Sequence, residues 1–183
     1  MAVAGGTQFL NFDEVIAKAK VIEGMKVGDF GCGNQGYFAI PLAQAVGKTG
    51  LVYAVDIQKP VLEAVQNKAK LQGITNMEFV WANLEKVGST GIPAASLDFE
   101  LLANVLFQNS KKLEILKEAS RLLKPGGRLM VVDWKKTGIP FGPPVNLRLD
   151  SSDVVKMSAE ANLRFGEEME VGSYFWGLIL VKA

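Results

Sequence analysis

A glycine-rich segment, Asp29–Phe38 with the sequence DFGCGNQGYF, constrains the fold of this chain more than any other feature. Its glycines, Gly31, Gly33 and Gly36, favour a tight turn, because glycine adopts backbone conformations that other residues avoid. An apolar run precedes the turn, and a second one ends at Asp56, twenty residues after Gly36. This order predicts a strand, a turn, a helix beginning near Gly36 and a second strand, as in a parallel βαβ unit.

The turn and the acidic residue that follows predict a site for a cofactor containing adenosine. The helix beginning near Gly36 is expected to direct unpaired N–H groups and its positive dipole end into a crevice. Asp56 lies where a carboxylate can accept hydrogen bonds from two ribose hydroxyl groups. Each such charge-assisted bond contributes about 1.5–3 kcal/mol, which is enough to fix the position of the ribose.

Two classes of cofactor fit this layout. The spacing Gly31-x-Gly33-x-x-Gly36, followed by an acidic residue about 20 positions on, is the dinucleotide fingerprint and favours an NAD(P)-dependent oxidoreductase. Asp29, two residues before the first glycine, argues against it, because a carboxylate repels a pyrophosphate by ~1 kcal/mol or more at 4 Å. S-adenosylmethionine carries a positive sulfonium and a positive amino group at that end. Asp29 therefore favours S-adenosylmethionine.

The chain resembles the class I S-adenosylmethionine-dependent methyltransferases over nearly all of its length. Five segments carry the resemblance in the family's order: Val27–Gly33 (VGDFGCG), Leu51–Ile57 (LVYAVDI), Phe79–Glu85 (FVWANLE), Leu97–Asn104 (LDFELLAN) and Leu122–Leu129 (LLKPGGRL). The last two are more specific than the glycines, since few other Rossmann-like families pair them in this order. Among relatives, the chain most resembles the small stand-alone methyltransferase domains near the quinone-biosynthesis type.

The resemblance implies S-adenosylmethionine as cofactor, S-adenosylhomocysteine as product and a defined set of contacts. Asp56 and Ile57 should bracket the ribose and one face of adenine. Asn83 stands where many relatives carry an aspartate that accepts from the adenine amino group, and Asn104 should lie beside the methyl group. The residues expected to bind the cofactor are Asp29, Gly31, Cys32, Gly33, Asn34, Gln35, Gly36, Asp56, Ile57, Asn83, Leu84 and Asn104.

Methyl transfer itself requires little covalent help from the protein. The sulfonium is an excellent leaving group, and orientation alone can lower the barrier by ~7–11 kcal/mol. Asn104, Asp133 and Tyr174 are the candidates for a catalytic group, and the latter two could act as a base. Asp133 could equally cap a strand end, whereas Asp98 and Cys32 are expected to be structural. No metal site is predicted, and the chain contains no histidine.

Hydrophobic periodicity predicts an α/β fold, a Rossmann-like three-layer sandwich with helices on both faces of the sheet. Strands are expected at 26–30, 51–56, 77–82, 97–103 and 128–133, and helices at 13–20, 36–46, 59–72 and 110–123. Asn11 or Asp13 is expected to cap the first helix, and Pro125–Gly127 to end the last of these four.

The C-terminal part departs from simple alternation. After a loop rich in glycine and proline at 138–144, Ser151–Asp153 are expected to cap a short helix that runs to about residue 161. Two extended runs, 163–171 and 174–182, are joined by Gly172-Ser173 and predict an antiparallel hairpin. The hairpin completes a mostly parallel, seven-stranded sheet, as in the methyltransferase family. A dehydrogenase would need further residues for a second substrate domain.

The 183 residues are expected to form a single methyltransferase domain. Its parts are a lead segment (1–25), a cofactor-binding half (26–134), and a substrate loop, helix and C-terminal hairpin (135–183).

Composition restricts the partners and the location. Lys and Arg number 20 against 19 Asp and Glu, so no long-range field directs the chain to nucleic acid. The single cysteine fits a reducing cytosol, and the N-terminus has no signal-peptide pattern. No apolar run approaches the ~20 residues that span a bilayer. We expect a cytoplasmic protein that acts on a small or amphiphilic molecule, with the accepting atom and the oligomeric state left open.

Three departures from the family's pattern keep a third hypothesis open, a non-catalytic S-adenosylmethionine-binding domain. The glycine turn has one residue more than the family's usual GxGxG. Asn83 replaces the usual aspartate, and the last hairpin carries Tyr174–Gly177 where close relatives often have histidine.

Overall fold

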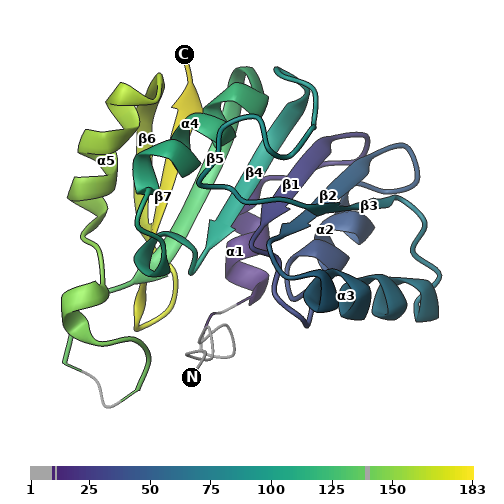
Figure 1. Cartoon of the computed structure of the whole chain (residues 1–183), viewed down its shortest axis with the longest axis horizontal. Coiled ribbons are helices and arrows are strands. Elements are labelled where there is room, and N and C mark those ends of the chain that lie inside the picture. Colours follow the sequence, from purple (N-terminus) through teal and green to yellow (C-terminus); the bar gives the residue numbers. More distant parts are fainter. Residues whose placement is uncertain (1–9, 11, 139–140) are drawn as a thin grey trace.

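The computed structural model describes Leu10 and residues 12–138 and 141–183 of the chain. In this part, seven strands form one sheet in the order β3-β2-β1-β4-β5-β7-β6 (Figure 1). The strands are β1 (Lys26–Phe30), β2 (Leu51–Asp56), β3 (Met77–Trp81), β4 (Leu97–Ala103), β5 (Leu123–Trp134), β6 (Leu163–Glu170) and β7 (Phe175–Lys182). Strands β1 to β5 are parallel, and β7 is antiparallel between β5 and β6.

Helices cover both faces of the sheet and make it the middle layer of three. The helices are α1 (Phe12–Ala19), α2 (Ala39–Ala45), α3 (Lys59–Leu71), α4 (Lys112–Leu122) and α5 (Ser151–Glu160), with short 3₁₀ turns η2 (Leu106–Gln108) and η3 (Val145–Leu147). Residues of α1, α2 and α3 pack in one core cluster, and residues of α4 and α5 pack in another on the opposite face. The predicted fold class, a Rossmann-like three-layer sandwich with a C-terminal antiparallel hairpin, is confirmed.

Alternation along the central strands explains how one sheet serves two cores. Phe99 and Leu101 of β4 belong to the α1–α3 side, whereas Leu102 belongs to the α4–α5 side, because successive side chains of a strand point to opposite faces. Strands buried on both faces need apolar residues at nearly every position. This requirement makes Glu100, which is fully buried in the same strand, an exception.

Two predicted element starts differ clearly from the structure. Helix α2 begins at Ala39 and not at Gly36, because Gly33 and Gly36 have positive φ angles that a right-handed helix excludes. Strand β5 begins at Leu123, so that Pro125–Gly127 lie in its irregular first part.

The remaining differences concern helix ends. Asp150 occupies the N-cap position of α5, and Ser151 is already helical. Asp13 lies in the first turn of α1, and Asn11, the other expected cap, falls outside the described residues.

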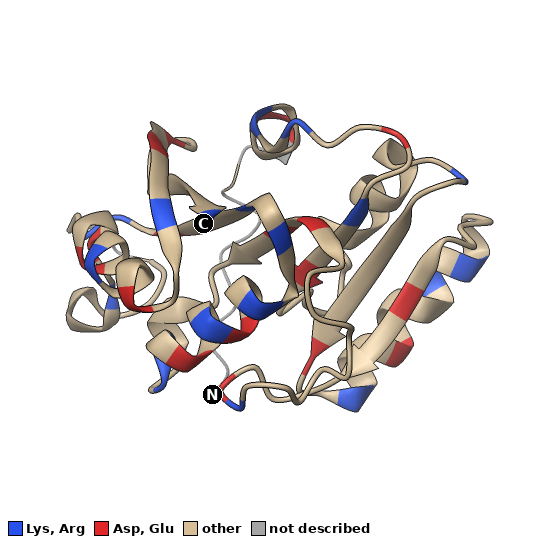
Figure 2. Ribbon diagram, turned by 90° about the horizontal axis from the view of Figure 1, so that it is seen from above, with Lys and Arg blue, Asp and Glu red and all other residues tan. Residues whose placement is uncertain are grey.

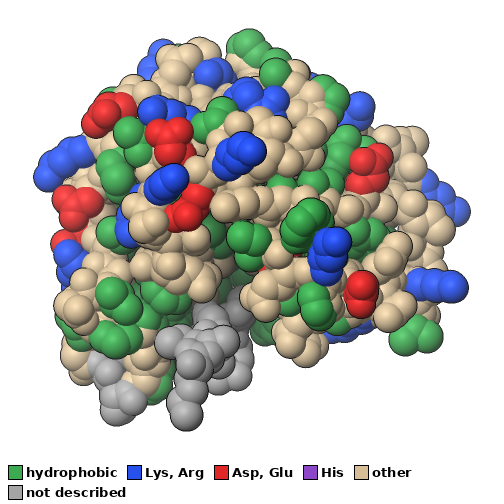
Figure 3. Space-filling model, viewed as in Figure 1, with side chains coloured by type: hydrophobic (Ala, Val, Ile, Leu, Met, Phe, Trp, Pro, Cys, Tyr) green, Lys and Arg blue, Asp and Glu red, His purple; other side chains and the backbone are tan. Residues whose placement is uncertain are grey.

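Charged residues are distributed without a single-sign field. Figure 2 shows Lys and Arg alternating with Asp and Glu along the helices, while the strands between them are mostly uncharged. The face seen in Figure 3 likewise mixes both signs with hydrophobic side chains. Within the described residues, no helix is both long and apolar enough to cross a membrane.

Candidate functional site

The glycine turn between β1 and α2 is folded against the end of β2. The backbone amides of Gly31 and Cys32 donate to the carbonyl oxygen of Val55 at 2.8 and 3.1 Å. The amide of Gly33 donates to Oδ2 of Asp56 at 3.3 Å. Sequence-distant parts of the predicted site are thus joined at the carboxyl ends of β1 and β2, next to the β1–β4 boundary where strand order reverses. Ligands of open α/β sheets bind at this kind of switch point.

The three glycines of the turn serve different purposes. All have positive φ angles, of +80° at Gly31, +61° at Gly33 and +55° at Gly36. A Cβ at Gly31 would lie 2.6 Å from Val105 Cγ2, and one at Gly36 would lie 2.7 Å from Val65 Cγ1. A Cβ at Gly33 would meet no atom within 4 Å. Gly31 and Gly36 are therefore required by packing, and only Gly33 faces open space that a ligand can enter.

Asp29 is a buried acid behind this turn. Its side chain is 1% exposed, and its Oδ2 atom has no hydrogen-bond partner among the described residues. Burial raises the pKa of Asp29 to about 7, a hydrogen bond from the backbone of Ala39 opposes the rise, and the charge of Asp56 adds to it. A positively charged ligand nearby would stabilise the ionised form.

The same hydrogen bond bears on the dinucleotide alternative. A helix that began at Gly36 would present free backbone amides to a ligand. Instead α2 begins at Ala39, whose amide is bound by the Asp29 carboxyl. A pyrophosphate would meet a carboxylate at the position where dinucleotide sites present a helix N-terminus. The geometry therefore favours a cationic over an anionic group at this end of the site.

Asp56, at the end of β2, lies where a ribose is expected, but its carboxylate already accepts hydrogen bonds from the protein backbone. It is 8% exposed, and its Oδ1 accepts from the amide of Gln58 at 3.0 Å. Ile57, the next residue, has 56% of its surface exposed. The Trp81 indole Nε1 donates to the Ile57 carbonyl at 2.8 Å, and Lys59 Nζ lies 4.3 Å from the centre of the Trp81 ring. Sequence reasoning did not select Trp81, whose place beside Ile57 arises only from β2–β3 pairing.

The predicted residues after β3 point in different directions. Asn83 is exposed, and its Oδ1 accepts from the amide of Glu85 at 2.9 Å. Leu84 is 9% exposed and packs into the α4–α5 core. Glu85 in turn accepts from the amides of Ser110 and Lys111, each at 2.8 Å. This segment is thereby tied to the start of α4.

The other residues of the turn are split between core and surface. Asn34 and Gln35 are exposed, and the Gln35 carbonyl accepts from Lys68 Nζ at 3.0 Å. Cys32 is buried in the α1–α3 core. Its burial, with the charges of Asp29 and Asp56, raises the pKa of the thiol, so Cys32 is not an activated nucleophile.

Asn104 and Asp133 meet at the carboxyl ends of β4 and β5. Asn104 is 4% exposed and has a φ of +59°. Its amide donates to the Val132 carbonyl at 2.8 Å, and its own carbonyl accepts from Gln108 Nε2 at 2.9 Å. A left-handed residue without glycine's freedom stores strain, a common property of functional sites.

Asp133 is fully buried and bonded to the backbone through both oxygens. Oδ2 accepts from the amide of Phe107 at 3.1 Å, and Oδ1 accepts from the amide of Trp134 at 2.8 Å. Burial raises its pKa to about 7, against the lowering effects of these two bonds and of the Lys112 charge. The carboxyl group holds η2 against β5. Asp98, expected to be structural, likewise binds the Lys26 amide and Lys124.

Tyr174 lies in the turn between β6 and β7 and is half-buried. Its carbonyl accepts from the amide of Lys135 at 2.9 Å, next to the end of β5. Its ring packs edge-on against Phe141 with 5.0 Å between the centroids. Tyr174 therefore lies at the same end of the sheet as Asp133.

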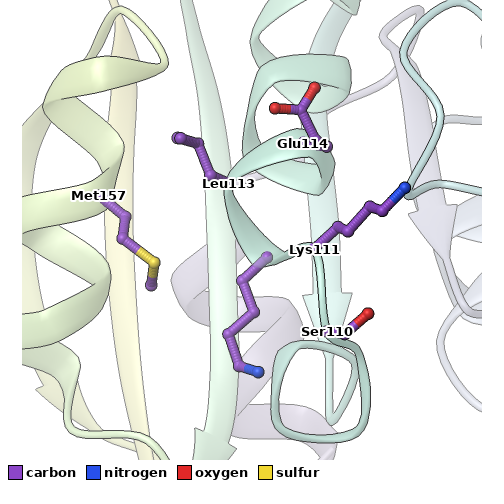
Figure 4. A pocket seen from close by; sticks show the side chains of 6 residues that line it. Ser110, Lys111, Leu113, Glu114 and Met157 are labelled. Carbon is purple, nitrogen blue, oxygen red and sulfur yellow. The ribbon is translucent and has the colours of Figure 1, made fainter.

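A separate hollow of about 560 Å³ lies beside the start of α4. Figure 4 shows the side chains of Leu113 of α4 and Met157 of α5 extending into the space between the two helices. The amides of Ser110 and Lys111 at its edge are bound by Glu85, so they are not free to hold an anion.

The site's features fit S-adenosylmethionine. Gly33 provides an open cradle, Asp29 provides a buried carboxyl oxygen without a partner among the described residues, and Asp56 lies across the turn. These site features and the strand order of the sheet are together typical of the class I S-adenosylmethionine-dependent methyltransferases. The chain matches a family described as a methyltransferase domain over residues 22–164, and it belongs to that family.

Relatives and solved structures agree with this assignment. A ubiquinone/menaquinone biosynthesis C-methyltransferase UbiE of Francisella philomiragia is 34% identical over 129 residues, covering 70% of this chain and 50% of the relative. A demethylmenaquinone methyltransferase of Geobacillus kaustophilus is 29% identical over 121 residues, covering 66% of this chain and 50% of the relative. The chain thus spans about half the length of these curated relatives.

The structural match is more extensive. The crystal structure of a SAM-dependent methyltransferase from Aquifex aeolicus has a TM-score of 0.87 and 28% identity, covering 98% of this chain and 94% of that chain. S-adenosylmethionine is accordingly the cofactor, and the NAD(P)-dependent alternative is not favoured.

Proposed function

We propose that this enzyme transfers a methyl group to a small lipophilic acceptor of the hydroquinone type. The main observation behind this proposal is the buried carboxyl of Asp29 next to the open space at Gly33, a pair that suits the cationic methyl donor. The acceptor class is proposed from the two relatives, whose names refer to ubiquinone, menaquinone and demethylmenaquinone. The near-neutral net charge of +1 supports an uncharged molecule over nucleic acid. We propose a cytoplasmic location because the single cysteine, Cys32, fits a reducing compartment.

We assign the cofactor contacts by position in the turn and at the strand ends. Asp56 would hold the ribose hydroxyls, and Ile57 with Leu84 would border the adenine. Asn83 would reach the adenine amino group through the second lone pair of its carbonyl oxygen. The remaining contacts would lie at the methionine end: Asp29, Gly31, Cys32, Gly33, Asn34, Gln35, Gly36 and Asn104.

The chemistry divides between the two parts of the domain. Residues 26–134 would hold the cofactor, which supplies an activated methyl group when bound. Residues 135–183 would hold the acceptor, and Tyr174 and Phe141 offer ring faces and edges to an aromatic molecule. Asp133 would act by position, because both of its oxygens already accept backbone hydrogen bonds. Tyr174 is left as the candidate for a proton-accepting group.

Two measurements test this proposal in order. Calorimetric titration with S-adenosylmethionine, S-adenosylhomocysteine and NADH should give micromolar binding of the first two alone. Labelled S-adenosylmethionine should then methylate chemically reduced 1,4-naphthoquinone or demethylmenaquinone. Binding without turnover on either acceptor would favour a non-catalytic domain, and binding of NADH alone would refute the assignment.

A further inference from the structure

Arg148 makes an unusual set of contacts at the end of the loop that follows β5. The side chain is 3% exposed, although arginine is rarely buried without a partner. Its Nε donates to the Pro143 carbonyl at 2.9 Å, and its Nη2 donates to the Phe141 carbonyl at 3.1 Å. Its Nη1 donates to the carbonyls of Lys135 and Thr137 at 3.0 and 2.8 Å.

These contacts use the shape of the guanidinium group. Its five N–H donors form a fixed planar fork, and its four acceptors are backbone carbonyls of segments 135–138 and 141–148. The group also lies 5.4 Å from the centre of the Trp134 ring. Lysine has three donors at one point and cannot span acceptors so arranged. Arg148 thus joins the described segments 135–138 and 141–148 to each other and to the end of β5.

The joined segments lie at the end of the sheet that carries the candidate site. In Figure 1, the described parts of the loop after β5 and the turn that precedes α2 lie at the same lower end of the sheet. Phe141 packs on Trp134 with 6.3 Å between the centroids and meets Tyr174 edge-on. A Cβ at Gly142 would lie 2.8 Å from the Trp134 ring, so the backbone is seated directly on that ring.

Other contacts of these segments are weaker. Lys136 pairs with Asp150 at 2.7 Å, but both side chains are more than a third exposed. Lys135 pairs with Glu170, whose side chain is 86% exposed. Exposed pairs of this kind contribute little, so the buried Arg148 is the main polar tie of the loop.

We propose that Arg148 is a positioning residue for the methyl acceptor. By binding four carbonyls it holds segments 135–138 and 141–148 as a fixed wall beside Trp134 and Tyr174. This inference rests on the proposed function only for the identity of the acceptor that the wall would contact. The cofactor's turn, 31–36, lies on other elements and does not depend on this tie.

The test compares Arg148→Lys with Lys136→Gln, a control that alters the same loop at its exposed pair. In Arg148→Lys, amide hydrogen exchange should accelerate in segments 135–138 and 141–148, while the affinity for S-adenosylhomocysteine stays unchanged. With reduced 1,4-naphthoquinone as acceptor, its KM should rise about tenfold and kcat should change less than about threefold, as expected for lost ground-state positioning. Lys136→Gln should match the wild type in all three measurements.

If Arg148→Lys folds poorly, Gly142→Ala is a second variant that disturbs the same wall. It keeps the Arg148 side chain but adds a Cβ that would lie 2.8 Å from the Trp134 ring, so the loop must shift off the ring and the same rise in KM is expected. Unchanged exchange or unchanged KM in both variants would overturn the inference, as would an equal loss of S-adenosylhomocysteine binding. If the wild type methylates no acceptor while Arg148→Lys shows the faster exchange, the proposed acceptor and the role of the wall are refuted and the tie itself stands.

Discussion

The backbone amide of Gly33 donates a hydrogen bond to the Asp56 carboxylate at 3.3 Å, across 23 residues of sequence. The bond joins the open glycine of the turn to the acid expected to bind the ribose. The other carboxylate oxygen, Oδ1, accepts from the amide of Gln58, so both oxygens of Asp56 are oriented before any ligand binds. Such orientation reduces what a ligand must spend on ordering the site.

Asp56→Asn tests the ribose contact. The substitution keeps the shape of the side chain but removes the charge that strengthens its bonds, and the affinity for S-adenosylmethionine should fall about 10–100-fold. Calorimetry measures the change. Asp98→Asn is the control, because Asp98 pairs with Lys124 at the opposite end of the sheet and should leave the affinity intact. An unaltered affinity in Asp56→Asn would remove the acid from the site.

Asp29 predicts proton release on cofactor binding. Its pKa of about 7 leaves the group partly protonated in the free protein at neutral pH. The cationic cofactor should stabilise the carboxylate and lower this pKa, so binding at pH 7 should release about half a proton. Titration in buffers of different ionisation enthalpy measures the release. It should vanish in Asp29→Asn and at pH 9, where the carboxyl is already ionised; proton uptake would contradict the prediction.

Gly33→Ala and Gly36→Ala should differ in kind. At Gly36 the added Cβ would lie 2.7 Å from Val65, so unfolding free energy should fall by about 2 kcal/mol or more. At Gly33 the Cβ meets open space, so only the cost of the positive φ remains, about 1–2 kcal/mol. Gly33→Ala should instead weaken cofactor binding. Thermal unfolding and calorimetry distinguish the two, and a stable Gly36→Ala would be inconsistent with the packing described.

Glu100 should make stability depend on pH. It is fully buried, and neither carboxyl oxygen has a hydrogen-bond partner among the described residues. Burial raises its pKa well above the usual 4.5, the charge of Glu118 adds to the rise, and Arg121 opposes it. The folded state therefore keeps a proton that the unfolded state loses, and stability falls as pH rises above about 4.5, by up to about 1.4 kcal/mol per pH unit.

Glu100→Met tests this dependence. The variant carries no such proton, so its unfolding free energy should exceed that of the wild type by a margin that grows from pH 5 to pH 8. Denaturant unfolding across that range measures the margin. Glu78→Met, at an exposed position of β3, is the matched control and should show no growing margin. A margin that shrinks with pH would show that Glu100 is ionised in the folded protein.

Much of the fold was predictable because its signals are local. The strands at 26–30, 51–56 and 97–103 have the predicted bounds, since apolar runs bounded by turn residues specify strands directly. The start of α2 was not, because the turn before it is held by Val55 and Asp56 of β2, which accept hydrogen bonds from the amides of Gly31, Cys32 and Gly33. Asp133 could have been a base or a cap from sequence alone. Its two backbone partners exist only once η2 has folded over β5.

The sequence by itself determined the order of strands and helices, the glycine turn and the acid that follows it. These features depend on hydrophobic periodicity and on the steric freedom of glycine, which are properties of residues that are close together in the sequence. Only the tertiary structure decided that Asp29 binds the start of α2, that Glu100 lies buried beneath α4, and that Arg148 gathers four carbonyls. Burial and hydrogen-bond partners depend on which distant segments the sheet order brings together, and no local pattern encodes that.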